Sequence, residues 1–223
     1  MIHVFDDPFS LAASLADDVA AALAENLRQA GRASLAVSGG QTPVRFFTQL
    51  AQAEIDWRCV MITLVDERWV PDTSPRSNTA LVNAHLLQGR AKAARFIPLV
   101  NDAATPEAGL AAIEAGLQAL ELPLTACVLG MGLDGHTASY FPGGEGLAAA
   151  LAPPPGQRIA IVRAAAAVEP RVALTLPVLL AAKCLALHIE GAAKRDVLMH
   201  RTAALPVSAV LDGHPNPVIF WSP

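Results

Sequence analysis

Short apolar runs alternate with longer alanine- and leucine-rich stretches along the chain. Such runs are typical of strands buried on both faces of a parallel sheet, and the stretches between them have the spacing of helices. The alternation therefore predicts an α/β fold with a mostly parallel sheet that helices cover on both faces. The expected strands span residues 34–37, 58–65, 95–98, 125–129, 158–162, 172–176, 184–189 and 217–221, and the expected helices span 8–30, 43–53, 78–88, 106–120, 177–182 and 192–200.

The length and composition limit what the chain can be. A length of 223 residues fits one domain, spanning residues 1–223. A hydrophobic content of 53% with 16% charged residues allows a large core and argues against disorder. The net charge is −4 and no basic block occurs, so we expect no nucleic-acid partner. A small anion can still be bound by a few local cations and backbone N–H groups.

The sequence also gives expectations about location and redox chemistry. No stretch approaches the roughly 20 apolar residues of a membrane helix, and the acidic N-terminus lacks the basic start of a signal peptide. The three cysteines, Cys59, Cys127 and Cys184, lie in or beside apolar runs without metal-like spacing. We therefore expect buried, reduced thiols in a cytoplasmic protein without a bound metal, either a monomer or a homodimer.

The first candidate binding loop is SGGQTP, residues 38–43, which follows an expected strand. Gly39 and Gly40 allow the backbone to approach a ligand closely, and Thr42 is expected to cap a helix that begins at Pro43. Free N–H groups at a helix start favour a phosphate. The alternative is a plain strand-to-helix turn, and the G-K-[ST] ending of a Walker A loop is missing.

A second polar loop, DERWVP, begins directly after the strand expected at 58–65. The position of Asp66, Glu67 and Arg68 at a strand end predicts that they face a ligand cleft. A solvated loop with a surface ion pair is the alternative, although Trp69 would anchor the loop against apolar surface. Ser77 precedes the next expected helix in the usual capping position.

The stretch GMGLDGHTASYFPGG, residues 130–144, has the glycine spacing of a dinucleotide-binding turn. That motif needs a long helix directly after the glycines and an acid about 20 residues further on. Here a proline and two glycines come almost at once, no acid stands at that distance, and Asp134 would repel a pyrophosphate. We interpret the glycines as a tight turn that exposes Asp134 and His136. A histidine beside a carboxylate on such a loop is a candidate general base.

Three cations complete the set of candidate site residues. Lys194 lies near the start of the helix expected at 192–200, where the helix dipole disfavours a positive charge unless an anion shares the site. Arg171 precedes an expected strand and Arg163 follows one. Each of the three is equally compatible with a solvated surface position.

Together, SGGQTP, DERWVP with the later SNTALV, GMGLDGHTASYFPG and GAAKRDVL resemble the short, bacterial-type 6-phosphogluconolactonase family in content and order. The resemblance spans about residues 30–211. It implies the sugar-phosphate isomerase-like α/β fold shared with glucosamine-6-phosphate deaminase. It also implies hydrolysis of 6-phosphoglucono-δ-lactone to 6-phosphogluconate in the oxidative pentose phosphate pathway. The implied partner is this small-molecule substrate, with no metal or organic cofactor.

The resemblance also assigns roles to residues. His136 would activate a water against the lactone carbonyl, Asp134 would arrange the loop and substrate hydroxyls, and Arg68 would steady negative charge on the substrate. A second set would hold the phosphate: Gly39, Gly40, Thr42, Lys194 and Arg171. Tyr140 departs from the family, which usually has leucine there. No G-x-S-x-G motif of a serine hydrolase is present, which fits direct attack by water.

Two other functions remain open at this point. The deaminase–isomerase branch shares the glycine loop and the D-G-H motif, but it resembles DEY where this chain has DER. It also places a glutamate soon after the histidine, and residues 137–143 of this chain contain no acid. The other alternative is a sugar-phosphate-binding module without catalysis, which loss of the histidine or of Arg68 would favour; both residues are present.

Overall fold

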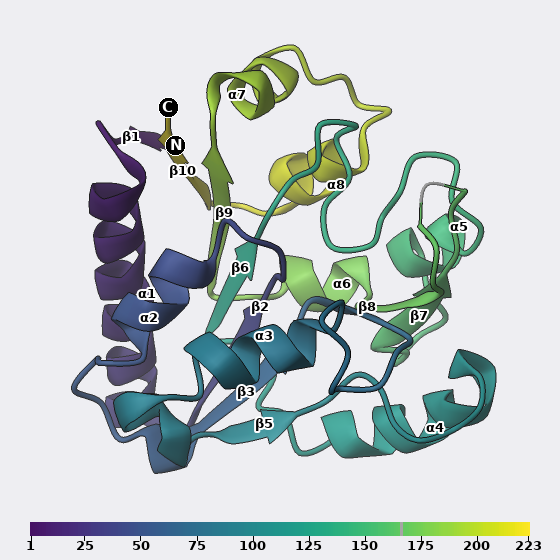
Figure 1. The fold of residues 1–223 in the computed structure, drawn as a ribbon, viewed down its shortest axis with the longest axis horizontal. Coiled ribbons are helices and arrows are strands. Elements are labelled where there is room, and N and C mark those ends of the chain that lie inside the picture. Colours follow the sequence, from purple (N-terminus) through teal and green to yellow (C-terminus); the bar gives the residue numbers. More distant parts are fainter. Residues whose placement is uncertain (166) are drawn as a thin grey trace.

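The computed structural model describes residues 1–165 and 167–223. A sheet of seven strands, all paired in parallel, crosses the molecule in the order β1-β10-β9-β6-β2-β3-β5 (Figure 1). The mostly parallel sheet predicted from the alternation is therefore confirmed. Its strands are β1 (Ile2–Val4), β2 (Ala33–Val37), β3 (Val60–Leu64), β5 (Arg95–Ile97), β6 (Ala126–Leu129), β9 (Cys184–Glu190) and β10 (Pro217–Ser222).

Helices cover both faces of this sheet, with α1 and α2 on one side and α6 and α8 on the other (Figure 1). The central strands β2 and β6 are buried along their whole length, which explains why their sequences are apolar except for Ser34. A fully buried side chain such as Leu35 contributes roughly 1.5–3 kcal/mol. The helices are α1 (Pro8–Ala30), α2 (Val44–Leu50), α3 (Asn78–His85), α4 (Pro106–Leu117), α5 (Leu147–Leu151), α6 (Leu176–Leu180), α7 (Ala192–Met199) and α8 (Pro206–Gly213).

Helix α1 illustrates how local sequence fixes an element. Its first free N–H groups are capped by Asp7, which accepts hydrogen bonds from the backbone of Phe9 and Ser10 at 2.7 and 2.9 Å. Gly31 ends the helix in a left-handed conformation and donates to the carbonyl of Leu27. Because both ends carry their own signals, the helix was predictable from the sequence at its full length.

A second sheet of three antiparallel strands stands apart from the first. It consists of β4 (Asp66–Arg68), β8 (Arg171–Leu174) and β7 (Ile159–Val162). The prediction of a polar loop after β3 was thus wrong for its first residues, because Asp66, Glu67 and Arg68 pair with β8. Polar side chains in that segment hid the strand, since its hydrogen-bond partner lies about a hundred residues away in sequence.

Several local predictions need correction. Helix α2 begins at Val44 with Pro43 as its N-cap and no side-chain cap, so Thr42 does not cap it as expected. Cys59 is exposed, against the prediction of three buried thiols, whereas Cys127 is buried. Strand β1 and helices α5 and α8 were not expected, because they are short and gain their stability from tertiary packing.

The chain reverses its direction of travel across the sheet between β2 and β6. From β2 it proceeds to the neighbouring β3 and then β5, whereas from β6 it proceeds the other way, to β9 and β10. The loops that leave two such strands diverge and open a crevice at their carboxyl ends. These two loops are SGGQTP after β2 and GMGLDGH after β6.

Two kinds of feature are absent from residues 1–165 and 167–223. No helix in this part of the chain combines the length and apolarity needed to cross a membrane. The same residues contain no group of three or more His, Cys, Asp or Glu side chains placed to hold a metal ion.

Candidate active site

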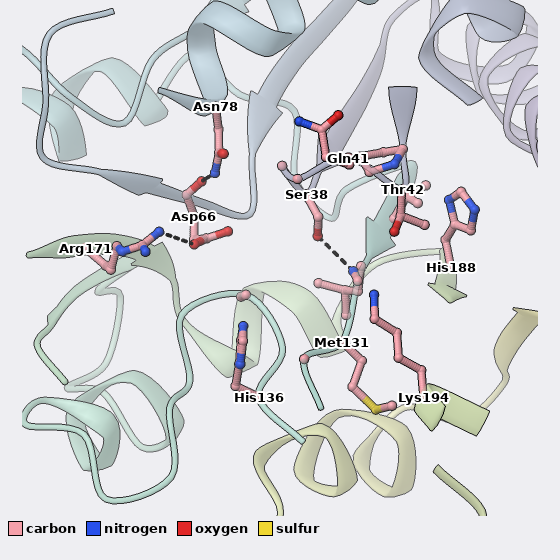
Figure 2. A pocket seen from close by; sticks show the side chains of 18 of the residues that line it. Ser38, Gln41, Thr42, Asp66, Asn78, Met131, His136, Arg171, His188 and Lys194 are labelled. Carbon is pink, nitrogen blue, oxygen red and sulfur yellow. Dashed lines mark hydrogen bonds and ion pairs between the residues drawn. The ribbon is translucent and has the colours of Figure 1, made fainter. Parts of the chain in front are cut away.

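A cavity of about 370 Å³ opens at the crevice between β2 and β6. Figure 2 shows Asp66, His136 and Arg171 on one side of it and Thr42, His188 and Lys194 on the other. We refer to these groups as the His136 end and the Lys194 end. The remaining lining residues come mainly from the two glycine loops: Ser38, Gly39, Gly40, Gln41, Pro43, Arg68, Asn78, Val128, Leu129, Gly130, Met131, Gly132, Ala138 and Phe141.

The SGGQTP loop presents unpaired backbone donors. Among the described residues, no hydrogen-bond acceptor meets the N–H groups of Gly39, Gly40, Gln41 and Thr42. Ser38 connects this loop to the end of β6 and the loop that follows it. Its N–H donates to Val128 O at 3.0 Å, and its Oγ accepts from Gly130 N at 3.0 Å. The loop is therefore anchored at its base and has free donors toward the cavity, as an anion site requires.

Gly39 is required by a close approach. A Cβ atom at this position would lie 1.9 Å from Oδ1 of Asn78, far inside van der Waals contact. Asn78 in turn accepts a hydrogen bond from Arg68 Nη1 at 3.2 Å and donates to Asp66 O at 2.9 Å. The absence of a side chain at Gly39 thus lets Asn78 join the loop to β4.

Glu67 fixes the start of α3 and, through it, the position of Asn78. The Glu67 side chain is buried and accepts from the backbone N–H of Asn78 at 2.9 Å and of Thr79 at 2.7 Å. It also accepts from Ser77 Oγ at 3.0 Å and from the N–H of Arg68 at 2.7 Å. A carboxylate at a helix N-terminus is favoured by the free donors and the dipole there. Glu67 therefore supports the site from behind and does not line the cavity.

Asp134 and His136 form a hydrogen-bonded pair. Nδ1 of His136 lies 2.5 Å from Oδ1 of Asp134, which also accepts from the backbone N–H of His136 at 3.2 Å. Partial burial acts to raise the pKa of Asp134, but these hydrogen bonds from His136 outweigh it and hold the pKa below its ordinary value. An ionised carboxylate can only accept, so the proton of the neutral ring lies on Nδ1 and Nε2 carries the lone pair.

The turn around this pair is built by glycine and an aromatic side chain. A Cβ atom on Gly132 would lie 2.3 Å from Nδ1 of His136 and 2.6 Å from Oδ1 of Asp134. The ring of Phe141 packs 4.6 Å from that of His136, centroid to centroid. No helix follows the glycines until α5, so the structure supports the rejection of a dinucleotide-binding turn.

Two arginines bring positive charge to the cavity. The Arg171 guanidinium is 3.9 Å from Oδ2 of Asp66 and lies over the Phe141 ring. Burial lowers the pKa of Arg171, with Asp66 opposing and Arg68 adding to this effect. The Nε atoms of Arg68 and Arg171 are buried and have no hydrogen-bond partner among the described residues.

Lys194 lies in the first turn of α7, close to the SGGQTP loop. Figure 2 shows its ammonium pointing toward the centre of the cavity. Burial lowers the pKa of Lys194, and Glu190 partly opposes this shift. The free N–H groups of the α7 first turn and the lysine together make this end of the cavity electropositive.

The structure brings the residues predicted from the sequence to one place. Seven of them line the cavity, namely Gly39, Gly40, Thr42, Arg68, His136, Arg171 and Lys194, and Asp134 contacts His136. Arg163 instead pairs with Glu107 outside the cavity. Sequence reasoning missed Met131, Phe141 and His188 as lining residues. His188 gave no signal, because it lies within an apolar run that reads as a core strand.

Comparison with known proteins gives consistent results. Residues 6–221 match the model of the family described as glucosamine-6-phosphate isomerases/6-phosphogluconolactonase. A 6-phosphogluconolactonase of Rhizobium meliloti (strain 1021) is 46% identical, covering 100% of this chain and 98% of the relative. The crystal structure of a 6-phosphogluconolactonase from Shewanella baltica OS155 is 38% identical with a TM-score of 0.96, covering 100% of this chain and 97% of that one. A monomeric glucosamine-6-phosphate deaminase, 18% identical over 99% of this chain and 96% of its own, shares the fold with a TM-score of 0.76.

Proposed function

Since the chain belongs to the family of glucosamine-6-phosphate isomerases and 6-phosphogluconolactonases, we propose that it hydrolyses 6-phosphoglucono-δ-lactone to 6-phosphogluconate. The observation that carries this proposal is the pairing of Asp134 with His136 at one end of a cavity whose other end collects free N–H donors and Lys194. One end is suited to activate water, and the other is suited to hold a phosphate.

The first step is the attack of water on the lactone carbonyl. His136 Nε2 takes a proton from the water as its oxygen bonds to the carbonyl carbon, and Asp134 stabilises the imidazolium that forms. The carbonyl oxygen becomes an oxyanion. Arg68 and Arg171 line the cavity, and their guanidinium groups are suited to stabilise that negative charge.

The second step breaks the bond between the carbonyl carbon and the ring oxygen. The ring oxygen leaves with the proton held by His136 and becomes a hydroxyl group, while the former carbonyl carbon becomes a carboxylate after loss of its acid proton. The histidine returns to its neutral form. No covalent intermediate with the protein is needed, because a lactone is an activated ester that water can attack once both are positioned.

The phosphate supplies binding energy away from the reacting bond. We assign it to the N–H groups of Gly39 and Gly40, with Thr42 and Lys194 beside them. Arg171 lies at the His136 end (Figure 2), and this position favours a contact with the reacting group over the phosphate contact expected from the resemblance.

Proton release at constant pH tests the activity. Purified protein mixed with freshly generated 6-phosphoglucono-δ-lactone is expected to accelerate acid formation well above the spontaneous rate. Lactone decay at the spontaneous rate, with a protein whose circular dichroism shows it folded, would contradict the proposal. Release of ammonia from glucosamine 6-phosphate would instead favour the deaminase branch of the family.

A further inference from the structure

His188 is a buried polar side chain that the reaction described above does not use. It lies in β9, lines the Lys194 end of the cavity and is only 2% exposed. Neither of its ring nitrogens has a hydrogen-bond partner in the described part of the chain. Most buried polar groups in native proteins are paired, so an unpaired imidazole at a cavity wall is a candidate contact for a bound group.

The charged neighbours of His188 do not satisfy it. Nε2 is 3.4 Å from Oε1 of Glu190 without hydrogen-bond geometry, and this Oε1 is itself unpaired among the described residues. The other oxygen of Glu190 is 3.9 Å from Nη1 of Arg45. The ring packs edge-on against Phe46, with 6.4 Å between centroids. His188 is thus held in place by apolar packing, and both of its ring nitrogens are buried without a hydrogen-bond partner among the described residues.

The protonation state of the ring fits a donor next to a lysine. Burial lowers the pKa of His188 to about 4, and Lys194 adds to the lowering. At neutral pH the ring is therefore uncharged, does not repel Lys194, and carries one N–H donor and one lone pair. A phosphate that contacts Lys194 offers oxygen acceptors for that N–H.

We propose that His188 binds the substrate phosphate, donating a ring N–H to a phosphate oxygen held between the SGGQTP loop and Lys194. This proposal rests on the proposed function, because it assigns the Lys194 end of the cavity to the phosphate group. His188 is then a specificity residue: it distinguishes phosphorylated from unphosphorylated lactones and takes no part in the attack by water.

The test compares His188→Phe with wild type on two lactones. Phenylalanine keeps an aromatic ring against Phe46 and removes both nitrogens. For 6-phosphoglucono-δ-lactone, KM is expected to rise about 10-fold or more, as for loss of a hydrogen bond to a charged group, with kcat within about threefold of wild type. For glucono-δ-lactone, which lacks the phosphate, kcat/KM is expected to stay unchanged. An equal loss on both lactones would overturn the proposal.

Conservative variants locate the donor. His188→Asn places an amide N–H near the position of Nδ1, and His188→Gln places one near that of Nε2. One of the two is expected to recover part of the affinity lost in His188→Phe. If His188→Phe does not fold, this pair decides the matter: unequal dissociation constants for inorganic phosphate support the proposal, and equal ones overturn it.

Direct binding separates this proposal from the proposed function. Calorimetric titration with 6-phosphogluconate and with inorganic phosphate needs no turnover, so it reports on His188 even if wild type hydrolyses neither lactone. His214→Phe is the matched control, since His214 is also buried but contacts Ala182 O away from the cavity. Its dissociation constants are expected to equal those of wild type. A His188→Phe protein that binds both ligands as wild type does would overturn the proposal.

Discussion

The two glycine-rich loops of the site follow neighbouring strands but contribute different groups to the cavity, backbone donors in one case and side chains in the other. SGGQTP, after β2, leaves backbone N–H groups without hydrogen-bond partners among the described residues, and its Ser38 side chain accepts a hydrogen bond from the other loop. GMGLDGH, after β6, uses its backbone for internal hydrogen bonds, such as Gly132 N to His136 O at 2.9 Å, and presents side chains. Glycine serves one loop by exposing the backbone and the other by making room for Asp134 and His136. Similar composition therefore does not imply similar chemistry.

The largest expected effect is a loss of kcat when the proposed base on the GMGLDGH loop is removed. Replacing His136 by alanine removes the proposed base and is expected to lower kcat by roughly 10²–10⁴-fold, while KM changes little. Steady-state kinetics on 6-phosphoglucono-δ-lactone measures both constants. His200→Ala, an exposed histidine in the same chain, serves as control and is expected to match wild type. A kcat for His136→Ala near the wild-type value would remove the chemical role from the GMGLDGH loop.

The next largest effect is an increase in KM when a cation beside the SGGQTP loop is removed. Lys194→Ala removes a charge-assisted hydrogen bond to the proposed phosphate and is expected to raise KM by roughly 10- to 100-fold, with a smaller change in kcat. Lys92→Ala, at an exposed position, is the control. If kcat falls while KM stays constant, Lys194 acts on the reacting group and the division between the ends of the cavity is wrong.

A pair of glycine substitutions sharpens the comparison further. Gly39→Ala and Gly132→Ala both place a Cβ atom inside a neighbouring side chain, Asn78 in one loop and His136 in the other. Each is expected to lower the free energy of unfolding by about 1–3 kcal/mol as the neighbour is displaced. We expect KM to change most in Gly39→Ala and kcat to change most in Gly132→Ala.

Thermal unfolding and steady-state kinetics measure the effects of both glycine substitutions, and Gly116→Ala is the control. Gly116 lies in α4, where an added Cβ atom would have nothing within 4 Å, and alanine there favours the helix. This control is expected to be neutral or slightly stabilising. Identical kinetic changes in Gly39→Ala and Gly132→Ala would show that the loops do not divide binding from chemistry.

The smallest effect is a pH dependence of stability at the Lys194 end. The pKa of His188 is about 4 in the folded protein, lowered by burial and by Lys194, against roughly 6.5 when unfolded. The unfolded chain therefore binds a proton first as pH falls, and stability decreases from pH 6.5 down to about 4 and then levels off. Between pH 6.5 and 5 this loss is expected to be about 1–2 kcal/mol. Urea unfolding at several pH values measures it, and His188→Phe is expected to reduce the slope in this range.

The fold class was predictable because its signals are local. The apolar runs at β2 and β6 and the caps of α1 lie within a few residues of the elements they define. Strand β4 was not predictable, because the polar residues Asp66, Glu67 and Arg68 form a strand only by pairing with β8. The short helices α5 and α8 were missed for the same reason: distant packing stabilises them.

The sequence by itself determined the α/β class, the two glycine loops at strand ends, and the identity of most residues around the cavity. Only the tertiary structure decided that β2 and β6 are neighbours, which brings the loops together, and that Arg171 lies beside Asp66. It alone showed that Glu67 supports α3 and that His188 reaches the cavity from an apolar strand. The physical reason is that strand order depends on long-range pairing, and so does the direction in which a side chain leaves a buried strand. The local sequence of one segment does not specify that pairing.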